Sequence, residues 1–343
     1  MTKAHLTPRR TEAESTAPDS APADSPTTMK AVVLDRFGGI EELVPREIAV
    51  PELAAGDVLI KVEYAGAGSW DAEEREGDYD GAFGVPSTFP YVLGWDGAGT
   101  VAATGRDVTR FVVGDRVYAA TTPVTRGGFY AEYGVVEEEF VARVPDRLPM
   151  SQAGAMPWDA LTALSGLDVL APHPGQSLMV FGASGGIGHM AVQLARSAGL
   201  RVLAIASGDD GVALAQRLGA DAAIDGRRDD VLAAAAEFAP DGLDGALVTA
   251  GGSIAEQALA AVKASGTIAW PNGVYPELAS SPAATVTRYD GDRSRAATDR
   301  LNEAIETGDL EVHIASTFPL ERARDAHEAM GKHYVGKQVL QVS

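Results

Sequence analysis

Four glycines between residues 182 and 188 are the residues whose type and spacing point most directly to chemistry. Gly182, Gly185, Gly186 and Gly188 form the pattern G-x-x-G-G-x-G. Residues without a Cβ let an anionic ligand approach the backbone, and free N–H groups at the start of a helix hold a phosphate. Glycine-rich turns also serve simply to pack a helix against a strand, so the pattern needs support from its surroundings.

The stretches on either side of the glycines supply that support. The apolar run 178–181 predicts a buried strand, and apolar residues at helical spacing over 190–198 predict a helix. The same alternation continues with predicted strands at 201–206, 221–224, 243–252 and 266–270 and predicted helices at 212–218, 231–238 and 255–262. This order predicts an α/β fold with a doubly wound parallel sheet, which binds a dinucleotide at the carboxyl ends of its strands.

That edge of the sheet carries the residues that we expect to bind the dinucleotide. The glycine turn lies there, and so do the ends of two later strands, which finish in small residues. The expected contacts from these three segments are Gly182, Ala183, Ser184, Gly185, Gly186, Ile187, Gly188, Ala250, Gly251, Gly252, Pro271, Asn272 and Gly273.

The remainder of the chain differs in composition and in predicted secondary structure. Residues 1–28 contain four prolines among small and charged residues, and we expect a disordered tail. Short strand-like runs separated by Gly, Pro and Asp dominate 29–149, which predicts a β-rich domain. The segment 296–343 is too small to fold alone, so we expect it to complete that domain. The dinucleotide-binding domain then spans 150–295 and begins with a helix over 151–170.

The composition narrows the classes of function. The chain has 343 residues and a formal net charge of −20, which argues against binding to nucleic acid or to an anionic membrane surface. It has no cysteine, which excludes disulfides, thiolate nucleophiles and Cys-ligated metals. No apolar run approaches the roughly 20 residues needed to cross a bilayer. We therefore expect a cytoplasmic protein that acts on a small molecule.

Further phrases accompany the glycine turn in a fixed order: MKAVV at 29–33, GWDGAGTV at 94–101, VGDRVY at 113–118, GGFYAEY at 127–133, LTAL at 161–164, LGAD at 218–221 and GKQVL at 336–340. Together they resemble the medium-chain dehydrogenase/reductase superfamily, specifically its zinc-free, zeta-crystallin-like quinone oxidoreductase branch. The resemblance implies a GroES-like catalytic domain, a Rossmann domain, and a cofactor in the cleft between them. It also implies a homodimer formed by edge pairing of the last Rossmann strand, for which 284–289 is the candidate.

Metal binding separates this branch from its sister, the zinc alcohol dehydrogenases, which hold zinc with Cys and His. Here Trp95 and Asp96 stand where those enzymes carry His-Glu, and the six histidines do not cluster in the sequence. We expect no metal. Without a Lewis acid, the feasible reaction is hydride transfer from a reduced nicotinamide to an electron-poor acceptor, a quinone or an α,β-unsaturated carbonyl.

The resemblance places the wall of the substrate cleft at 65–79. Trp70 and Tyr79 are the candidates for stacking on the substrate or hydrogen bonding to it, although both residue types also pack in ordinary loops. Relatives commonly have Asn where this sequence has Gly68, so this chain lacks one polar group of the quinone site that the resemblance implies. Thr162 matches the family threonine that lies against the cofactor.

The end of the second Rossmann strand governs the choice between NADP and NAD. Residues 206–208 read ASG, so Ser207 and Gly208 leave room for a 2′-phosphate where an acidic residue would select NAD. Asp209 and Asp210 follow, and they either cap the next helix or disfavour NADP. The cationic side chains that could reach a phosphate are Arg227, Arg228 and Lys337. We favour NADP over NAD.

Two other interpretations stay open. An enoyl-thioester reductase or a biosynthetic tailoring reductase of the same fold would use the same cofactor site with a longer substrate groove. A non-catalytic dinucleotide-binding protein with a regulatory or structural role would keep the glycine turn without turnover. Reduction of acyl-thioesters would identify the first, and cofactor binding without any turnover would favour the second.

Overall fold

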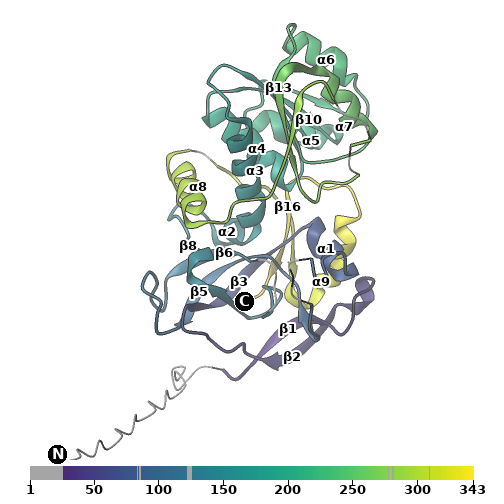
Figure 1. The fold of residues 1–343 in the computed structure, drawn as a ribbon. Coiled ribbons are helices and arrows are strands. Elements are labelled where there is room, and N and C mark those ends of the chain that lie inside the picture. Colours follow the sequence, from purple (N-terminus) through teal and green to yellow (C-terminus); the bar gives the residue numbers. More distant parts are fainter. Residues whose placement is uncertain are drawn as a thin grey trace, which may run out of the picture.

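The computed structural model describes residues 26–82, 84, 86–121, 126–276, 278–279, 282–308 and 310–343. We expected a tail at 1–28, and residues 1–25 of it lie outside the described residues. The first strand begins at Thr28. Figure 1 shows two lobes, one built largely from strands of the N-terminal part of the chain and the other from a sheet flanked by helices.

A seven-stranded sheet is the centre of the β-rich lobe. Its order is β15-β16-β3-β5-β6-β8, with β7 also paired to β3, and a smaller sheet has the order β2-β1-β4. The pair β15–β16 is parallel and its neighbours are antiparallel. The strands are β1 (Thr28–Leu34), β2 (Val44–Ala49), β3 (Asp57–Ala67), β4 (Tyr91–Val92), β5 (Asp96–Thr104), β6 (Arg116–Ala120), β7 (Tyr133–Glu137), β8 (Val141–Arg143), β15 (Ile314–Pro319) and β16 (Lys337–Gln341).

Strand β16 brings the end of the chain back to this lobe. Val339 pairs with Gly66 and Leu340 with Ala65 on β3. The last strand therefore lies in the same sheet as a strand that is far away in the sequence. Figure 1 shows β16 rising between the two lobes. Its position puts the residues just before it, at 332–336, beside the other lobe.

The second lobe is a six-stranded parallel sheet of order β11-β10-β9-β12-β13-β14. Its central strand β9 is buried at every residue, as the continuous apolar run predicts for a sheet covered on both faces. The predicted fold class, a β-rich GroES-like part with a Rossmann parallel sheet, is confirmed. The strands are β9 (Ser177–Phe181), β10 (Arg201–Ala206), β11 (Ala222–Asp225), β12 (Leu243–Val248), β13 (Val262–Pro271) and β14 (Thr285–Tyr289).

The helices differ from the prediction at three places. The helix predicted over 255–262 is α-helical only to Ala258, is followed by a 3-10 helix at Leu259–Ala261, and gives way to a strand at Val262. Where a single helix was expected over 151–170, the chain forms two helices that meet at Met156, because Pro157 has no N–H to donate and begins a new helix. The expected loop at 65–79 contains a helix, α1. The helices are α1 (Ser69–Glu76), α2 (Met150–Ala155), α3 (Pro157–Leu170), α4 (Gly186–Ser197), α5 (Gly208–Arg217), α6 (Val231–Phe238), α7 (Ser253–Ala258), α8 (Arg295–Thr307) and α9 (Ala323–Met330).

The elements between the lobes complete the scaffold. Helix α2 packs on β3, β5 and β16, whereas α3 packs on α4, β13 and α8. Four short 3-10 helices, η1 (Ile40–Glu42), η2 (Glu138–Phe140), η3 (Leu259–Ala261) and η4 (Leu320–Arg322), occupy connections. Among the described residues, none of the helices has the length and apolar character required to pass through a bilayer.

Candidate active site

The glycine turn joins β9 to α4 at the carboxyl edge of the parallel sheet. Gly182 has a φ of +83°, and a Cβ there would approach the Thr249 hydroxyl to 2.5 Å. A Cβ on Gly188 would overlap the carbonyl oxygen of Gly182. Gly185 is the N-cap of α4, and no described side chain caps that helix start. The turn therefore offers free backbone donors to an anion at the positive end of a 12-residue helix.

A cavity of about 300 Å³ opens at this turn, and we call it the nucleotide cavity. An adjoining cavity of about 330 Å³ runs toward the start of α7. The predicted cofactor residues that line the nucleotide cavity are Gly182, Ser184, Gly185, Gly186, Ile187, Ser207, Arg227, Ala250 and Lys337. Gly251 and Gly252 line the adjoining cavity, while Thr162, Pro271, Asn272 and Gly273 line a third one described below. Ala183, Gly188 and Gly208 line none of the three.

Two hydroxyl groups in these cavities lack a hydrogen-bond partner among the described residues. Ser207 Oγ lies at the end of β10, and Thr162 Oγ1 lies on α3 with only 4% of the residue exposed. A buried hydroxyl without a partner is costly unless a ligand supplies one. Their separation between β10 and α3, on either side of the glycine turn, fits an extended dinucleotide.

Asp209 and Asp210, in the first turn of α5, each pair with a basic side chain. Asp209 pairs with Arg228 at 2.8 Å, and Asp210 pairs with His333 at 2.9 Å. Both carboxylates therefore have a basic neighbour. Arg227 lines the nucleotide cavity beside Ser207, and Lys332 and His333 line it from the segment before β16.

Lys337 lies at the floor of the nucleotide cavity, between two buried carboxylates. Its ammonium forms an ion pair with Asp159 and lies 4.0 Å from Asp96 Oδ2 and 5.3 Å from the centre of a Trp70 ring. Burial raises the pKa of Asp96 to about 7 and also raises that of Asp159, while the Lys337 charge acts in the opposite direction. Burial lowers the pKa of Lys337, but the two carboxylates outweigh it and the net change is upward. The ammonium form is thereby maintained.

The side chains around Asp96 and Asp159 can be compared with the ligands that a zinc ion requires. Asp96 Oδ1 accepts a hydrogen bond from the Trp158 N–H at 2.7 Å, and Asp96 Oδ2 faces Lys337. The chain has no cysteine, and the described residues contain no group of three His, Asp or Glu side chains placed to hold a metal. A tetrahedral zinc site needs converging sulfur or imidazole donors. The donors at this position do not fit zinc.

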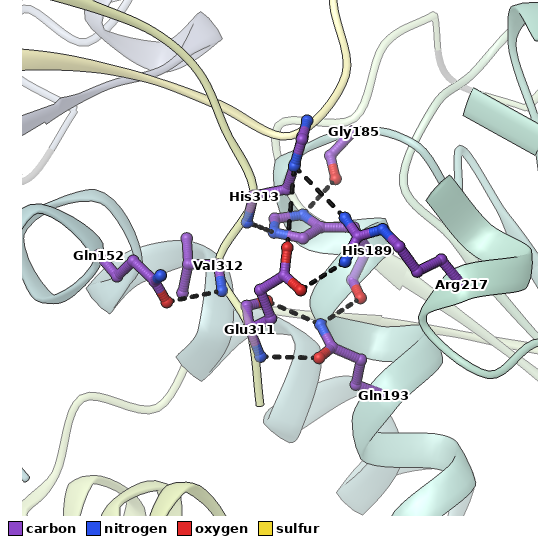
Figure 2. A network of polar contacts seen from close by, with 8 residues as sticks. All are labelled: Gln152, Gly185, His189, Gln193, Arg217, Glu311, Val312 and His313. Carbon is purple, nitrogen blue, oxygen red and sulfur yellow. Dashed lines mark hydrogen bonds and ion pairs between the residues drawn. The ribbon is translucent and has the colours of Figure 1, made fainter. Parts of the chain in front are cut away.

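Figure 2 shows how the glycine turn is fixed to the segment that returns to the β-rich lobe. Gly185 O accepts a hydrogen bond from His189 Nδ1 at 2.8 Å, and His189 Nε2 accepts one from the His313 N–H at 3.2 Å. Gly336 N–H donates to Ser184 O at 2.8 Å. Both strands that cross back to the β-rich lobe are therefore hydrogen-bonded to the turn or to α4.

His189 works in this network as a neutral group. Because Nε2 accepts from a backbone N–H, the proton lies on Nδ1 and is donated to Gly185 O. Burial lowers the pKa of His189 to about 4, so the neutral form persists near pH 7. Gln193 extends the network by bonding both main-chain groups of Glu311, at 2.8 Å each.

A larger cavity of about 650 Å³ adjoins the nucleotide cavity, and we call it the acceptor cavity. Its wall includes the predicted Trp70 and Tyr79 together with Trp95 and Trp158. Trp70 is stacked on Trp95 with ring centroids 6.1 Å apart, while Trp158 meets Trp95 edge-on at 5.3 Å. Tyr79 lies 5.3 Å from Trp95. These aromatic faces form a wall suited to a planar, largely apolar ligand.

Two glutamates on α1 hold this wall in place. Glu74 is buried and accepts hydrogen bonds from Trp95 Nε1 at 2.8 Å and from the Tyr91 hydroxyl at 2.6 Å; burial raises its pKa to about 7. Glu73 lines the cavity and accepts a hydrogen bond from the Tyr79 hydroxyl at 2.7 Å. The indole and phenol groups are therefore oriented by carboxylates beneath them.

Gly68 explains the departure noted in the sequence. A Cβ at this position would lie 3.0 Å from the Trp70 indole, so the ring already occupies the space that an Asn side chain would need. Trp70 therefore fills the space beside Gly68 at the junction of the two cavities and presents an aromatic face there. Sequence reasoning missed Trp95, Lys332, His333 and Arg293 as cavity residues. Trp95 lay in a recognised phrase, but the other three stand in connections without a motif.

These features define a class of protein: a GroES-like lobe and a Rossmann lobe, with a dinucleotide cavity that meets an acceptor cavity between them. Residues 54–146 match the family described as an alcohol dehydrogenase GroES-like domain, and residues 186–284 match the family described as a zinc-binding dehydrogenase.

Full-length comparisons agree with these matches. An alcohol dehydrogenase of Rhizobium meliloti (strain 1021) is 36% identical over 267 residues, which cover 71% of this chain and 76% of that protein. The NADPH-dependent alkenal/one oxidoreductase, chloroplastic, of Arabidopsis thaliana is 31% identical over 331 residues, covering 94% and 81%. The structure of the quinone oxidoreductase from Coxiella burnetii has a TM-score of 0.80 and 26% identity, covering 92% of this chain and 100% of that one. The chain belongs to the medium-chain dehydrogenase/reductase superfamily, in its quinone oxidoreductase branch, and is an oxidoreductase.

Proposed function

We propose that this oxidoreductase uses NADPH, without zinc, to reduce a quinone or an α,β-unsaturated carbonyl. The observation that carries the proposal is the shared wall of the two cavities. Trp70, Ile187, Thr249 and Ala250 line both the nucleotide cavity and the acceptor cavity. A nicotinamide bound at this junction would face a planar acceptor held by the aromatic wall.

The preference for NADPH rests on charge at the end of β10. The Arg227 guanidinium has no carboxylate partner among the described residues, and Ser207 Oγ beside it is unpartnered. Both groups are suited to a phosphate, which Arg binds with its forked donors. The name of the Arabidopsis relative includes NADPH dependence, which agrees with this choice.

When bound, a reduced nicotinamide supplies a hydride to the β-carbon of an enone or to a quinone, and a proton from water completes the reduction. The protein contributes geometry and exclusion of water. The free N-terminus of α4 would hold a phosphate of the dinucleotide, Lys337 would add a positive charge to the same cavity, and the Trp95 and Trp158 rings would orient the acceptor. The unpartnered Thr162 hydroxyl is available to a carbonyl or amide oxygen in the acceptor cavity.

The test is oxidation of NADPH and, in parallel, of NADH with quinones, enones, enals, enoyl-thioesters and simple alcohol–aldehyde pairs, before and after treatment with a zinc chelator. We expect NADPH-dependent reduction of a quinone or enone that the chelator leaves unchanged. Loss of activity with the chelator, or turnover restricted to alcohols and aldehydes, would contradict the proposal. Tight NADPH binding with no turnover of any acceptor would favour a non-catalytic role.

We also propose a homodimer that pairs through β14. This strand ends the parallel sheet, and its recorded strand partner among the described residues is β13 alone. An open edge is a template for pairing with a second copy. Light scattering of the purified protein should give twice the 35.6 kDa chain mass. Replacing Val286 with proline, which removes an N–H from β14 and disrupts strand pairing there, should yield monomers.

A further inference from the structure

Arginine side chains in the described part of the chain nearly all have polar partners. They pair with carboxylates, with backbone carbonyls or, for Arg288, with Asn272. The guanidinium groups of Arg227 and Arg293 have neither kind of partner within the described residues. Each of the two lines a cavity: Arg227 the nucleotide cavity and Arg293 the acceptor cavity.

Arg293 is half-buried at the edge of the acceptor cavity. Its guanidinium stacks over the Phe140 ring with a distance of 4.1 Å to the centroid. Burial lowers the pKa of Arg293, and the nearby Glu137 and Glu139 act in the opposite direction without forming an ion pair with it. A cation that has lost part of its hydration and has no ion pair is unfavourable unless a ligand supplies the counter-charge.

The loop that carries Arg293, between β14 and α8, is fixed on both sides. Asp292 N–H donates to Ser165 Oγ at 2.9 Å, and the Asp292 carboxylate accepts from Ser294 N and Ser294 Oγ at 2.8 and 2.9 Å. Ser294 Oγ in turn caps α8 by accepting from Ala297 N at 3.3 Å. The backbone around Arg293 is therefore already ordered, and little conformational entropy is lost when a ligand binds.

Arg293 differs from the other charged residues that line the acceptor cavity. Among the described lining residues it is the single cation, and the two carboxylates are Glu73 and Asp290. Glu73 already accepts the Tyr79 hydroxyl, while Asp290 is exposed. The cavity thus combines an aromatic wall with one unpaired guanidinium.

We propose that Arg293 binds an anionic group of the acceptor, so that the natural substrate is a planar quinone or enone that carries a carboxylate. This inference rests on the proposed function, and it adds the substrate class to it. The planar guanidinium matches a carboxylate through two parallel hydrogen bonds, and the Phe140 ring holds it in one orientation. The aromatic rings of the wall then contact the conjugated part of the same molecule.

A matched pair of acceptors tests the proposal. One aryl enone is prepared with a para-carboxylate and with a para-methoxycarbonyl group, which are similar in size and shape but differ in charge. The ester withdraws electrons more strongly than the ionised acid, so intrinsic reactivity toward hydride favours the ester and cannot produce a preference for the acid. We expect the wild-type protein to have a kcat/KM on the order of 10–100-fold higher for the acid, as a charge-assisted pair provides. Arg293→Gln should abolish this preference by lowering kcat/KM for the acid much more than for the ester, and an unchanged Kd for NADPH would show that the variant is folded.

Two further variants control for folding and surface charge. Arg295→Gln removes a nearby arginine that pairs with Asp299 on the surface of α8 and does not line the cavity. It should keep the preference for the acid. Arg293→Lys retains a charge but not the fork, so we expect an intermediate preference; it also serves if Arg293→Gln does not fold. Equal kcat/KM for acid and ester in the wild type, or an unchanged preference in Arg293→Gln, would overturn the proposal.

A binding measurement separates failure of this inference from failure of the proposed function. If neither acceptor is reduced, the proposed function fails for this compound class. Quenching of tryptophan fluorescence by the para-carboxylate, measured with NADPH-bound protein, still reports occupation of a cavity lined by three tryptophans. About tenfold weaker binding to Arg293→Gln than to wild type is the expected result. Equal binding to both proteins contradicts a role for Arg293.

Discussion

The nucleotide cavity and the acceptor cavity share a wall, yet they are built by different means. Glycine, alanine and serine supply much of the lining of the nucleotide cavity, and the turn at 182–188 adds the free backbone N–H groups at the start of α4. The acceptor cavity is formed mainly by larger side chains from α1, the residue before β5, α3 and the connections after β13 and β14. A site made of backbone tolerates few changes of residue, whereas a site made of side chains can change its ligand by exchange of single residues.

The junction between the cavities combines the two kinds of construction. Lys337 and Asp159 line the nucleotide cavity, and Trp70, over which the Lys337 ammonium lies, lines both cavities. The ion pair is buried, and burial of charges is costly unless each one is paired. Four sets of substitutions test how these parts of the molecule are held, beginning with the buried ion pair.

Lys337→Met should have the largest effect on stability. It leaves Asp96 and Asp159 buried without their cation, which should lower the free energy of unfolding by about 3–5 kcal/mol. In the folded protein the pKa values of Asp96 and Asp159 lie above the ordinary 3.8, so protonation of these carboxyls favours folding. This contribution to stability is complete below pH 3.8 and, for Asp96, is lost as the pH rises through about 7. Urea unfolding should therefore show a smaller deficit at about pH 5.5 than at about pH 7.5.

The matched control for this variant removes one of the two stranded charges. Lys337→Met combined with Asp159→Asn should recover part of the lost stability at about pH 7.5, because one buried carboxylate becomes neutral. A deficit that is the same at both pH values, or that the second substitution deepens, would show that the ion pair is not the source of the effect.

Gly188→Ala and Gly185→Ala test the backbone construction of the nucleotide cavity. A Cβ on Gly188 would overlap Gly182 O, so the turn must shift in Gly188→Ala. We expect the free energy of unfolding to fall by about 1–3 kcal/mol and the affinity for NADPH to fall as well. A Cβ on Gly185 would lie 3.5 Å from Gly182 O, an ordinary contact. Gly185→Ala should keep the thermal midpoint of the wild type. Calorimetry and NADPH titration measure both quantities, and equal thermal midpoints for the two variants would contradict the argument.

Arg227→Gln tests whether the end of β10 selects a phosphate. Losing one charge-assisted contact should raise the Kd for NADPH on the order of tenfold and leave the Kd for NADH unchanged. Arg228→Gln is the control, because its side chain is exposed, pairs with Asp209 and does not line the cavity. Equal weakening of both cofactors by Arg227→Gln would assign Arg227 to another part of the dinucleotide.

His189→Gln tests the link between the glycine turn and the β-rich lobe, with the smallest expected effect. Loss of one of its two hydrogen bonds should cost about 1 kcal/mol. The folded pKa of His189, about 4, lies below the ordinary 6.5, so its contribution is present above 6.5 and is lost as the pH falls toward about 4. The stability of His189→Gln should therefore fall less steeply with acidification. His173→Gln, at an exposed loop position, should follow the wild-type pH dependence. A slope unchanged by His189→Gln would refute the link.

The elements that the sequence predicts well are those with a local signal. Strand β9 has a continuous apolar run, and the helix predicted at 231–238 coincides with α6, because hydrophobic spacing and the capping Asp230 lie within or directly beside the element. The break at Met156 was missed, since the residues on both sides of it have helical spacing and Pro157 is equally at home in a first turn. Helix α1 was taken for a loop, because its charged sequence offers no apolar face.

The glycine turn, the alternation of strands and helices, and the absence of cysteine can be read from the residues alone, since each is a property of neighbouring residues or of composition. The contact between Lys337 and Asp159, 178 positions apart, and the common wall of Trp95 and Trp158 become visible in the folded chain. The same is true of Arg293, which lines the acceptor cavity without a carboxylate partner among the described residues. These features depend on which side chains the fold brings together, and no local pattern encodes such long-range contacts.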